Sequence, residues 1–241
     1  MLTIAFDLDD TLYGLEGPYL QMLAESFPGK DLPGRELFLR QLDHFEECFR
    51  RAQAGDFPME NLFAERQVLA FGDFGLPVTQ ERALELQDCY HDCQRRIALS
   101  DEVRGMLDKL VAARDEGRLR VGILSNGHSQ NQWRKIRILG LERWFPREQI
   151  VVSEDVGCAK PDARIFELAL GQLGGTIADV EAGDCWYVGD SLKNDVAGAR
   201  NAGWKCIWVD HGYKTPGRES ANPDLTARDE HQMVDAVLSL L

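Results

Sequence analysis

The sequence predicts an α/β protein with a parallel sheet covered by helices on both faces and an inserted all-helical domain. Short apolar runs rich in β-forming residues recur along the chain, and segments with helical periodicity separate most of them. Strands that alternate with helices form βαβ units, and such units build a parallel sheet. The stretch 14–96 departs from this alternation, because it contains helical segments and no convincing strand.

Apolar runs mark the predicted strands. The first covers residues 2–8, and its length and composition are those of a buried strand. The later strands are expected at Leu119–Leu124, Gln149–Ser153, Cys185–Val188 and Cys206–Val209.

The helices between these strands are predicted from apolar spacing. One helix has apolar residues at i, i+3, i+4, i+7 and i+8, beginning with Val103. Ser100 is placed to cap its start and Gly117 to end it. A second helix is expected to begin at Pro161, and a last amphipathic helix is expected within Pro223–Leu241.

Residues 14–96 read as several helices separated by turns. The turns are expected at Pro28-Gly29, Pro33-Gly34, Phe57-Pro58 and Gly75-Leu76-Pro77. We therefore expect an α/β core formed by 1–13 and 97–241, and a helical domain formed by 14–96.

Composition limits the partners that the protein can bind. The chain has 241 residues, with 27 Lys+Arg against 40 Asp+Glu and a formal net charge of −13. This acidity argues against a nucleic-acid polymer or an anionic membrane as a partner, since both require a positive surface. A small phosphorylated ligand remains compatible, because a bound metal ion can reverse the local charge. The composition does not indicate an oligomeric state.

The chain carries no pattern typical of secretion or of a membrane protein. Its start lacks the basic, apolar and small-residue regions of a signal peptide, and no run approaches the ~20 apolar residues of a membrane span. The cysteines are scattered, without a CxxC pair, which favours free thiols in a reducing compartment. We therefore expect a cytoplasmic protein.

Polar motifs stand at or just after the ends of the predicted strands. In chain order they are Asp7-Leu8-Asp9-Asp10-Thr11-Leu12, Ser125-Asn126, Lys160-Pro161 and Gly189–Asp195. Open α/β sheets bind ligands at the carboxyl ends of their strands. Asp7 and Asp9 are two residues apart, so at a strand end their side chains point to the same side.

The motifs resemble those of the haloacid dehalogenase (HAD) superfamily of phosphohydrolases. Each motif alone is weak, whereas their combination and order are specific. The resemblance covers about 1–13 and 97–213, and the position of the helical insertion matches the helical cap of that family. It implies a Rossmann-like catalytic core and a phosphatase that acts on a small phosphomonoester, either a sugar phosphate or a nucleoside monophosphate.

The same resemblance implies catalytic roles. Asp7 would be the nucleophile that forms an aspartyl-phosphate, and Asp9 would be the acid for the leaving group and then the base that activates water. Lys160 would position Asp7 against the phosphoryl oxygens. Ser125 and the backbone N–H of Asn126 would hold the phosphate.

The resemblance also implies a magnesium site. Asp7, Asp190 and the backbone carbonyl of Asp9 would bind Mg²⁺, and Asp195 would support that site directly or through water. Carboxylates gathered in one pocket repel one another and an anionic substrate, so a divalent cation would offset a physical penalty. Hard oxygen ligands suit Mg²⁺.

Structural roles are the alternative for several of these residues. Ser125-Asn126 could cap a helix over Gln130–Leu139, Lys160 could be a solvated lysine, and Asp195 could stabilise a helix N-terminus. Asp10 is expected to be solvated. Cys89 and Cys93 are expected to be semi-buried thiols on one helix.

Two alternative functions are a 2-haloacid dehalogenase and a non-catalytic phosphate-binding regulatory protein. In the HAD family, dehalogenases typically lack the second aspartate of the first motif, because a halide leaves without a proton. Asp9 is present, which argues against dehalogenation. A non-catalytic protein is disfavoured because every expected site position is retained.

Overall fold

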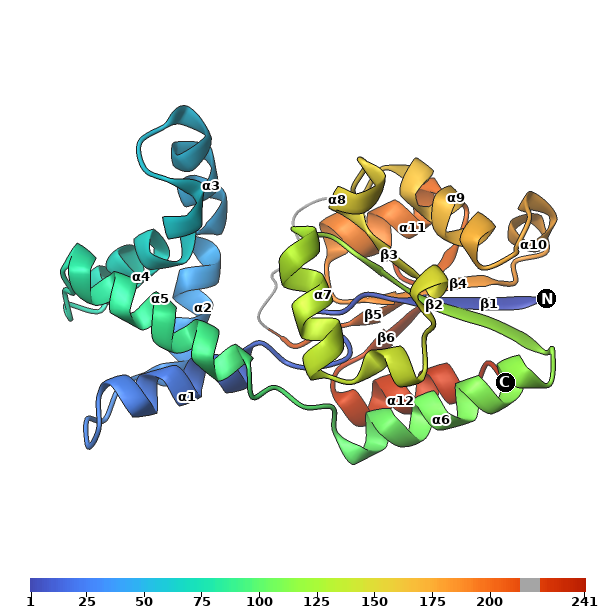
Figure 1. The fold of residues 1–241 in the computed structure, drawn as a ribbon, viewed down its shortest axis with the longest axis horizontal. Helices are drawn as coiled ribbons and strands as arrows, with labels where there is room; N and C mark the ends of the chain where they lie inside the picture. The colour runs from blue at the N-terminus through green and yellow to red at the C-terminus, as the bar shows by residue number, and fades with distance from the viewer. Residues whose placement is uncertain (213–221) are drawn as a thin grey trace. The chain divides into compact units, whose positions relative to one another are not determined.

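The computed structural model describes residues 1–212 and 222–241. The chain divides into two compact units (Figure 1). The α/β unit contains Met1–Gly14 and Ala98–Leu241, and the helical unit contains Leu15–Ile97. Residues 213–221 of the expected α/β core lie outside the described residues.

The α/β unit contains a parallel six-stranded sheet in the order β3-β2-β1-β4-β5-β6. The strands are β1 (Leu2–Phe6), β2 (Leu119–Ser125), β3 (Ile150–Val152), β4 (Cys185–Gly189), β5 (Lys205–Val209) and β6 (Leu225–Ala227). The prediction of a parallel α/β sheet is confirmed. The sequence did not indicate β6, because this edge strand has three residues and two of them are exposed.

The order of the strands reverses at β1, which has β2 on one side and β4 on the other. Such a switch point opens a crevice at the carboxyl ends of the strands, where ligands of open α/β sheets bind. Asp7 follows β1 directly, so the fold carries the first motif to this crevice.

Helices cover both faces of the sheet (Figure 1). One face carries α6 (Asp101–Asp115) and α12 (Glu230–Leu238), and the other carries α9 (Ala163–Gln172) and α11 (Ala197–Asn201). The remaining helical segments of this unit are α7 (Ser129–Ile138), α8 (Ser153–Val156), α10 (Ile177–Glu181), a π-helix over Leu192–Val196, and 3₁₀ turns over Leu141–Arg143 and Arg147–Gln149.

Helix ends follow the expected capping chemistry, with one correction. The Ser100 hydroxyl accepts the backbone N–H of Val103 at 3.0 Å and caps α6, as predicted. The helix expected to begin at Pro161 begins instead at Ala163. Its cap is Asp162, whose carboxylate accepts the backbone N–H of Arg164 at 3.0 Å. The Asp162 carboxylate satisfies a backbone N–H of the first turn, whereas Lys160, which would be the N-cap of a helix that began at Pro161, has no side-chain acceptor.

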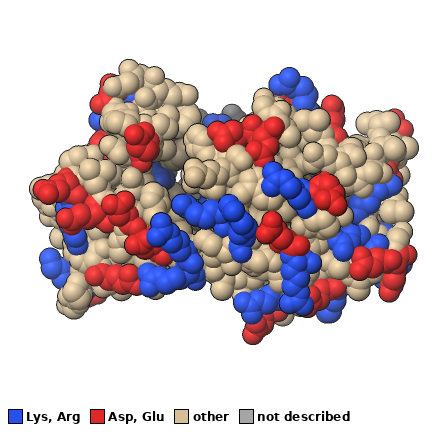
Figure 2. Space-filling view, viewed as in Figure 1, with Lys and Arg blue, Asp and Glu red and all other residues tan. Residues whose placement is uncertain are grey.

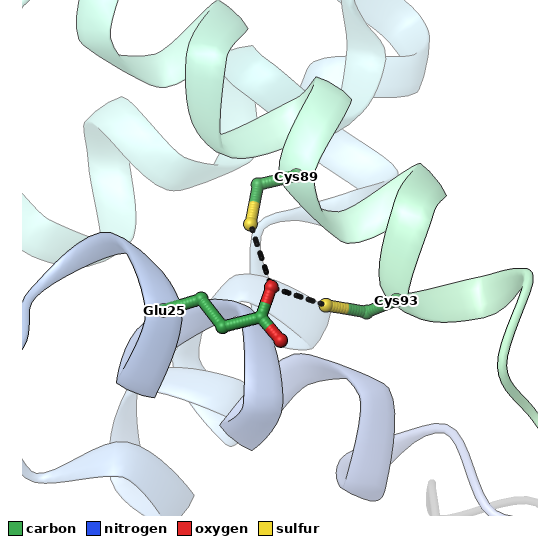
Figure 3. A group of neighbouring side chains, drawn as sticks. All are labelled: Glu25, Cys89 and Cys93. Carbon is green, nitrogen blue, oxygen red and sulfur yellow. Dashed lines mark hydrogen bonds between the residues drawn. The ribbon is translucent and has the colours of Figure 1, made fainter.

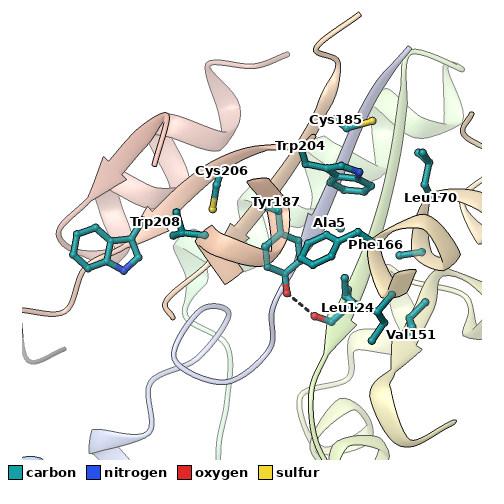
Figure 4. Close-up of a cluster of buried hydrophobic side chains, with 14 residues drawn as sticks. Ala5, Leu124, Val151, Phe166, Leu170, Cys185, Tyr187, Trp204, Cys206 and Trp208 are labelled. Atoms are coloured by element: carbon teal, nitrogen blue, oxygen red, sulfur yellow. Dashed lines mark hydrogen bonds between the residues drawn. The ribbon is translucent and has the colours of Figure 1, made fainter. Parts of the chain in front are cut away.

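Aromatic and aliphatic side chains from β1, β2, β4 and β5 pack against α9 and α11 (Figure 4). Phe166 lies edge-on to Tyr187 with ring centroids 5.1 Å apart, and to Trp204 at 5.8 Å. The Tyr187 hydroxyl donates to the carbonyl of Leu124 at 2.6 Å (Figure 4). This cluster fixes β4 against β2 below the ends of the strands.

The helical unit consists of α1 (Glu16–Ser26), α2 (Gly34–Asp43), α3 (Phe45–Ala54), α4 (Leu62–Asp73) and α5 (Gln80–Gln94), with a 3₁₀ turn at Met59–Asn61. Its core is aromatic: Phe63 and Tyr90 stack with centroids 4.4 Å apart, and Tyr19 packs against Phe38 at 5.4 Å. The buried Tyr19 hydroxyl donates to Gln67 at 2.8 Å, which satisfies its polar group inside the core.

Charged side chains of both signs are interspersed on the visible face of each unit (Figure 2). No helix in the described part of the chain is long and apolar enough to cross a bilayer. All of the cysteines, at positions 48, 89, 93, 158, 185 and 206, are free thiols.

Candidate active site

The carboxyl ends of β1 and β4 bring a group of buried carboxylates together. Asp7, Asp190 and Asp195 are 8%, 4% and 1% exposed, respectively. Each offers an oxygen atom that lies within 4.8 Å of those of the other two. The backbone N–H of Asp7 donates to the carbonyl of Val188 at 2.8 Å, which ties the end of β1 to β4.

Lys160 is buried against this group, so a solvated role for it is wrong. Its Nζ lies 2.8 Å from Asp7 Oδ1, 2.7 Å from Asp195 Oδ1 and 2.7 Å from the Tyr187 hydroxyl. An ammonium group has three N–H donors, and each faces an acceptor here. Burial alone would lower the pKa of Lys160, but the charges of Asp195 and Asp7 outweigh it and raise the pKa.

Asp195 holds Lys160 in place. One of its oxygens pairs with Lys160, and the other accepts the backbone N–H of Ser191 at 2.8 Å. A Cβ on Gly189 would lie 2.5 Å from the Asp195 carboxylate, so only glycine allows this approach. Asp195 is therefore a residue that positions Lys160, and this role does not depend on a bound metal ion.

The electrostatics of Asp7 favour a cation beside it. Burial raises the pKa of Asp7 to about 6, and the negative charges of Asp195 and Asp9 act in the same direction against the opposing charge of Lys160. The carboxylates of this group therefore outnumber its cationic side chains. Its three buried carboxylates are hard oxygen donors, and they fit a divalent cation such as Mg²⁺.

Asp9 lies in a different environment from Asp7. Lys135 Nζ lies 2.8 Å from Oδ1 and 2.7 Å from Oδ2 of Asp9. Gln132 donates to Asp9 Oδ2 at 3.2 Å, and the Tyr13 hydroxyl donates to Oδ1. Burial would raise the pKa of Asp9, but the charge and hydrogen bond of Lys135, with the other donors, lower it. Asp9 is thus held as a carboxylate, the form of a base.

The sequence did not indicate these partners of Asp9. Gln132 and Lys135 are three residues apart on α7 and so share a helix face, and both are buried. The only available signal was a lysine on the helix that follows a strand end. Lysines on helices are mostly solvated, so the signal acquires meaning only once the fold has placed α7 beside Asp9.

Ser125 is the last residue of β2 and Asn126 follows it, at the strand end as expected, but neither caps α7. The N-cap of α7 is His128, so the capping alternative is wrong. Ser125 is 1% exposed. The Asn126 side chain donates to the Lys160 carbonyl at 3.0 Å and accepts the Lys160 N–H at 2.9 Å. Asn126 therefore joins the end of β2 to the backbone that carries Lys160.

Asp10 is buried, with 4% exposure, which corrects the expectation of a solvated residue. Its backbone has φ of 55°, a left-handed conformation that aspartate tolerates better than most residues. His211 contacts its carbonyl at 2.7 Å between Nε2 and the oxygen. The tight turn after Asp9 draws Asp10 into the protein.

A family model described as haloacid dehalogenase-like hydrolase matches residues 1–203. The phosphoserine phosphatase of Thermus thermophilus is 36% identical over 74% of this chain and 64% of its own length. The glyceraldehyde 3-phosphate phosphatase of Methanopyrus kandleri is 29% identical over 98% of this chain and 97% of its own.

One solved structure extends the comparison to the fold. The L-2-haloacid dehalogenase of Xanthobacter autotrophicus has a TM-score of 0.68 at 18% identity, over 100% of both chains. At this identity the likeness shows the fold alone. The present chain spans less than two thirds of the length of the Thermus thermophilus relative, at 64%.

Proposed function

The chain belongs to the haloacid dehalogenase-like hydrolases, and from this premise we propose that it is a Mg²⁺-dependent phosphatase of small phosphomonoesters. The two relatives with phosphatase names support a phosphorylated substrate of metabolite size. We place catalysis on the α/β unit, and we assign the helical unit, residues 15–97, the role of a cap that selects the substrate.

The observation that carries this proposal is that Asp7 and Asp9 of the first motif are each paired with a different lysine. Asp7 is paired with Lys160, and Asp9 is paired with Lys135. Displacement of an alkoxide from phosphorus needs a nucleophile and a separate acid–base group. Two carboxylates, each held in place by a lysine of its own, can supply both groups.

In the first half-reaction, an Asp7 carboxylate oxygen forms a bond to phosphorus as the bond from phosphorus to the ester oxygen breaks. A proton on Asp9 passes to the leaving alkoxide. Asp9 takes this proton from solvent before the first turnover and from the attacking water in each later one, and it keeps the proton only while its pair with Lys135 is loosened. Lys160 fixes the orientation of Asp7 through its 2.8 Å contact. Ser125 and the N–H of Asn126 bind the phosphoryl oxygens.

In the second half-reaction, Asp9 takes a proton from water and the water oxygen attacks phosphorus. The bond between Asp7 and phosphorus breaks, and inorganic phosphate leaves. Lys135, Tyr13 and Gln132 hold Asp9 as the carboxylate that this step requires. Mg²⁺ bound by Asp7 and Asp190, with the Asp9 carbonyl and support from Asp195, would neutralise charge on the transferring group.

A 2-haloacid dehalogenase is the second candidate, because the fold also occurs in such an enzyme. Its leaving group is a halide, which departs without a proton. The contacts that Lys135, Tyr13 and Gln132 make to Asp9 then have no part in the chemistry. The structure around Asp9 therefore favours phosphate ester hydrolysis.

The direct test is phosphate release from p-nitrophenyl phosphate and from a panel of sugar phosphates and nucleoside monophosphates. We expect turnover with Mg²⁺, none with EDTA, and none in Asp7→Asn. Asp115→Asn is the matched control, because the Asp115 side chain is 65% exposed and lies on α6. Chloride release from a 2-haloacid would favour the dehalogenase, and phosphate binding without turnover would favour a regulatory protein.

A further inference from the structure

The helical unit contains a second group of metal-binding side chains, on α1 and α5. Glu25 extends from α1 toward Cys89 and Cys93, which lie one turn apart on α5 (Figure 3). Each sulfur lies 3.9 Å from Glu25 Oε2. The three donor atoms all lie within 4.8 Å of one another. We propose that Glu25, Cys89 and Cys93 form a Zn²⁺ site that joins α1 to α5, with a fourth position open to solvent.

The spacing of the donor atoms is close to that of a tetrahedral site. With bonds of about 2.3 Å to sulfur and about 2.0 Å to oxygen, a sulfur and an oxygen ligand are about 3.5 Å apart across a tetrahedral ion. The two sulfur–oxygen distances are 3.9 Å, so the donors need to move by only a few tenths of an ångström. Thiolates with a carboxylate favour Zn²⁺ over Mg²⁺, because sulfur is a soft ligand.

The same two cysteines are poorly placed for a disulfide. Residues four apart on a helix have Cβ atoms about 5–6 Å apart. A disulfide requires a Cβ separation of about 3.8 Å, so oxidation would have to unwind the end of α5. A metal ion spans the larger distance and leaves the helix intact.

The surrounding charges fit a dication with two thiolates and a carboxylate. Arg96 lies 2.9 Å from Glu25 Oε1 and donates to Oε2 at 3.0 Å and to Cys93 Sγ at 3.2 Å. Its positive charge, together with that of Zn²⁺, balances the three negative charges of the ligands. Once both thiols are deprotonated, the Glu25 oxygen that faces the sulfurs accepts only from Arg96 and has a second lone pair for the metal.

Access and protonation set the conditions for binding. Glu25 is exposed and Cys89 is half-buried, so an ion reaches the group from solvent, whereas Cys93 is 1% exposed. Burial raises the pKa of the Cys93 thiol to about 11, with the nearby Cys89 and Glu25 acting in the same direction. Zn²⁺ therefore has to displace protons, and its affinity increases with pH.

This inference goes beyond the proposed phosphatase, because none of its residues belongs to the active site described above. Its test is Co²⁺ titration of the reduced, metal-stripped full-length protein in excess Mg²⁺. We expect equimolar Co²⁺ to produce the near-ultraviolet charge-transfer band of a thiolate–Co²⁺ bond. The carboxylates near Asp7 contain no sulfur and produce no such band. The outcome therefore does not depend on whether the protein is a phosphatase.

Variants locate the ligands. Cys89→Ser and Cys93→Ser should lose most of the band and bind Co²⁺ at least about 100-fold more weakly, and Glu25→Gln should weaken binding while it keeps both thiols. Cys158→Ser, a half-buried cysteine of the α/β unit, should keep the full band. Far-ultraviolet circular dichroism checks that each variant folds. A wild-type protein without the band, or a folded Cys89→Ser variant with a band of wild-type intensity, overturns the proposal.

Discussion

Two ligand clusters of the same size occur in the two units, and they differ in chemistry. Asp7, Asp190 and Asp195 contribute only oxygen donors, whereas Glu25, Cys89 and Cys93 contribute two sulfurs and one oxygen. In both clusters the donors lie within 4.8 Å of one another and one cationic side chain contacts two of the three residues. Donor type alone therefore assigns a hard cation to the first and a soft cation to the second.

The two clusters also differ in how far their side chains are buried. Asp7, Asp190 and Asp195 are nearly inaccessible, and Lys160 beside them is 5% exposed. In the helical unit, Glu25 is exposed and Arg96 is half exposed, with 48% of its side chain accessible. A buried group with fixed partners is pre-organised for chemistry, whereas an exposed group at a helix–helix contact is suited to holding the two helices together.

Loss of the Asp7 carboxylate should have the largest effect on activity and none on the metal site of the helical unit. Asp7→Asn should lower phosphate release by at least about 10⁴-fold, since the nucleophile itself is lost. The same variant should keep the thiolate–Co²⁺ band of the helical unit unchanged. Steady-state assays measure the rate of phosphate release and the Co²⁺ titration measures the band, both on the same preparation. Loss of both properties together would contradict the independence of the clusters.

Removal of Lys160 should have the next largest effect. Lys160→Met leaves Asp7 and Asp195 buried without their cation, which should cost about 3–5 kcal/mol of stability as well as activity. Lys160→Arg should not restore the rate, because a planar guanidinium cannot direct donors to three separate acceptors as an ammonium does. Denaturant unfolding and kcat measurements check both. Tyr187→Phe, which removes one acceptor, should show a much smaller loss of each.

Lys135 provides a finer test. Among the described residues, Asp9 is the only carboxylate of the site that it contacts. Lys135→Met should slow hydrolysis of the phosphorylated intermediate, because Asp9 is then no longer held as the carboxylate that takes a proton from water. This step is common to all substrates, and acid–base catalysis contributes about 10²–10⁴-fold, which bounds the loss. The exposed Lys109→Met is the control. Rapid-quench kinetics with p-nitrophenyl phosphate measures this step, and an unchanged rate of intermediate hydrolysis would show that Lys135 does not act through Asp9.

The sequence was sufficient for five of the six strands and for the motif residues at their ends. Apolar runs ending in polar motifs predicted the strands that carry Asp7, Ser125 and Asp190, because the direction of a parallel strand fixes which end its motif occupies. Periodicity and the Ser100 cap likewise predicted α6.

Other features depend on tertiary contacts that no local pattern reports. Lys135 and Tyr187 become part of the site only when α7 and β4 pack beside β1. The pairing of Glu25 with Cys89 and Cys93 depends on α1 meeting α5, residues 64 and 68 positions apart in the chain. Asp10 was expected in solvent, but its left-handed backbone turns it inward.

The smallest expected effect is on the stability of the metal-free protein. Burial raises the pKa of folded Asp7 to about 6, above the unfolded value of 3.8. The folded protein therefore binds this proton more tightly, and its stability falls as pH rises from about 4 to about 6. In EDTA above pH 6, Asp7→Asn should be more stable than wild type by up to about 3 kcal/mol.

Thermal unfolding at several pH values measures this gain. It should shrink as the pH falls from about 6 and vanish below about pH 3, where wild-type Asp7 is protonated in both states, and it should shrink again when Mg²⁺ binds the wild-type carboxylate. An Asp7→Asn variant less stable than wild type at every pH would mean that the charge of Asp7 stabilises the fold.

The most direct test of the central claim is chemical trapping of the phosphorylated residue. Asp9→Asn should slow hydrolysis of the intermediate while p-nitrophenolate still departs without an acid, so the intermediate should accumulate in Mg²⁺. Borohydride reduction after rapid quenching converts an aspartyl-phosphate to homoserine, which peptide mass spectrometry locates. The account predicts this conversion at Asp7 alone. Phosphate release with no modification of Asp7, or with modification of another residue, would contradict it.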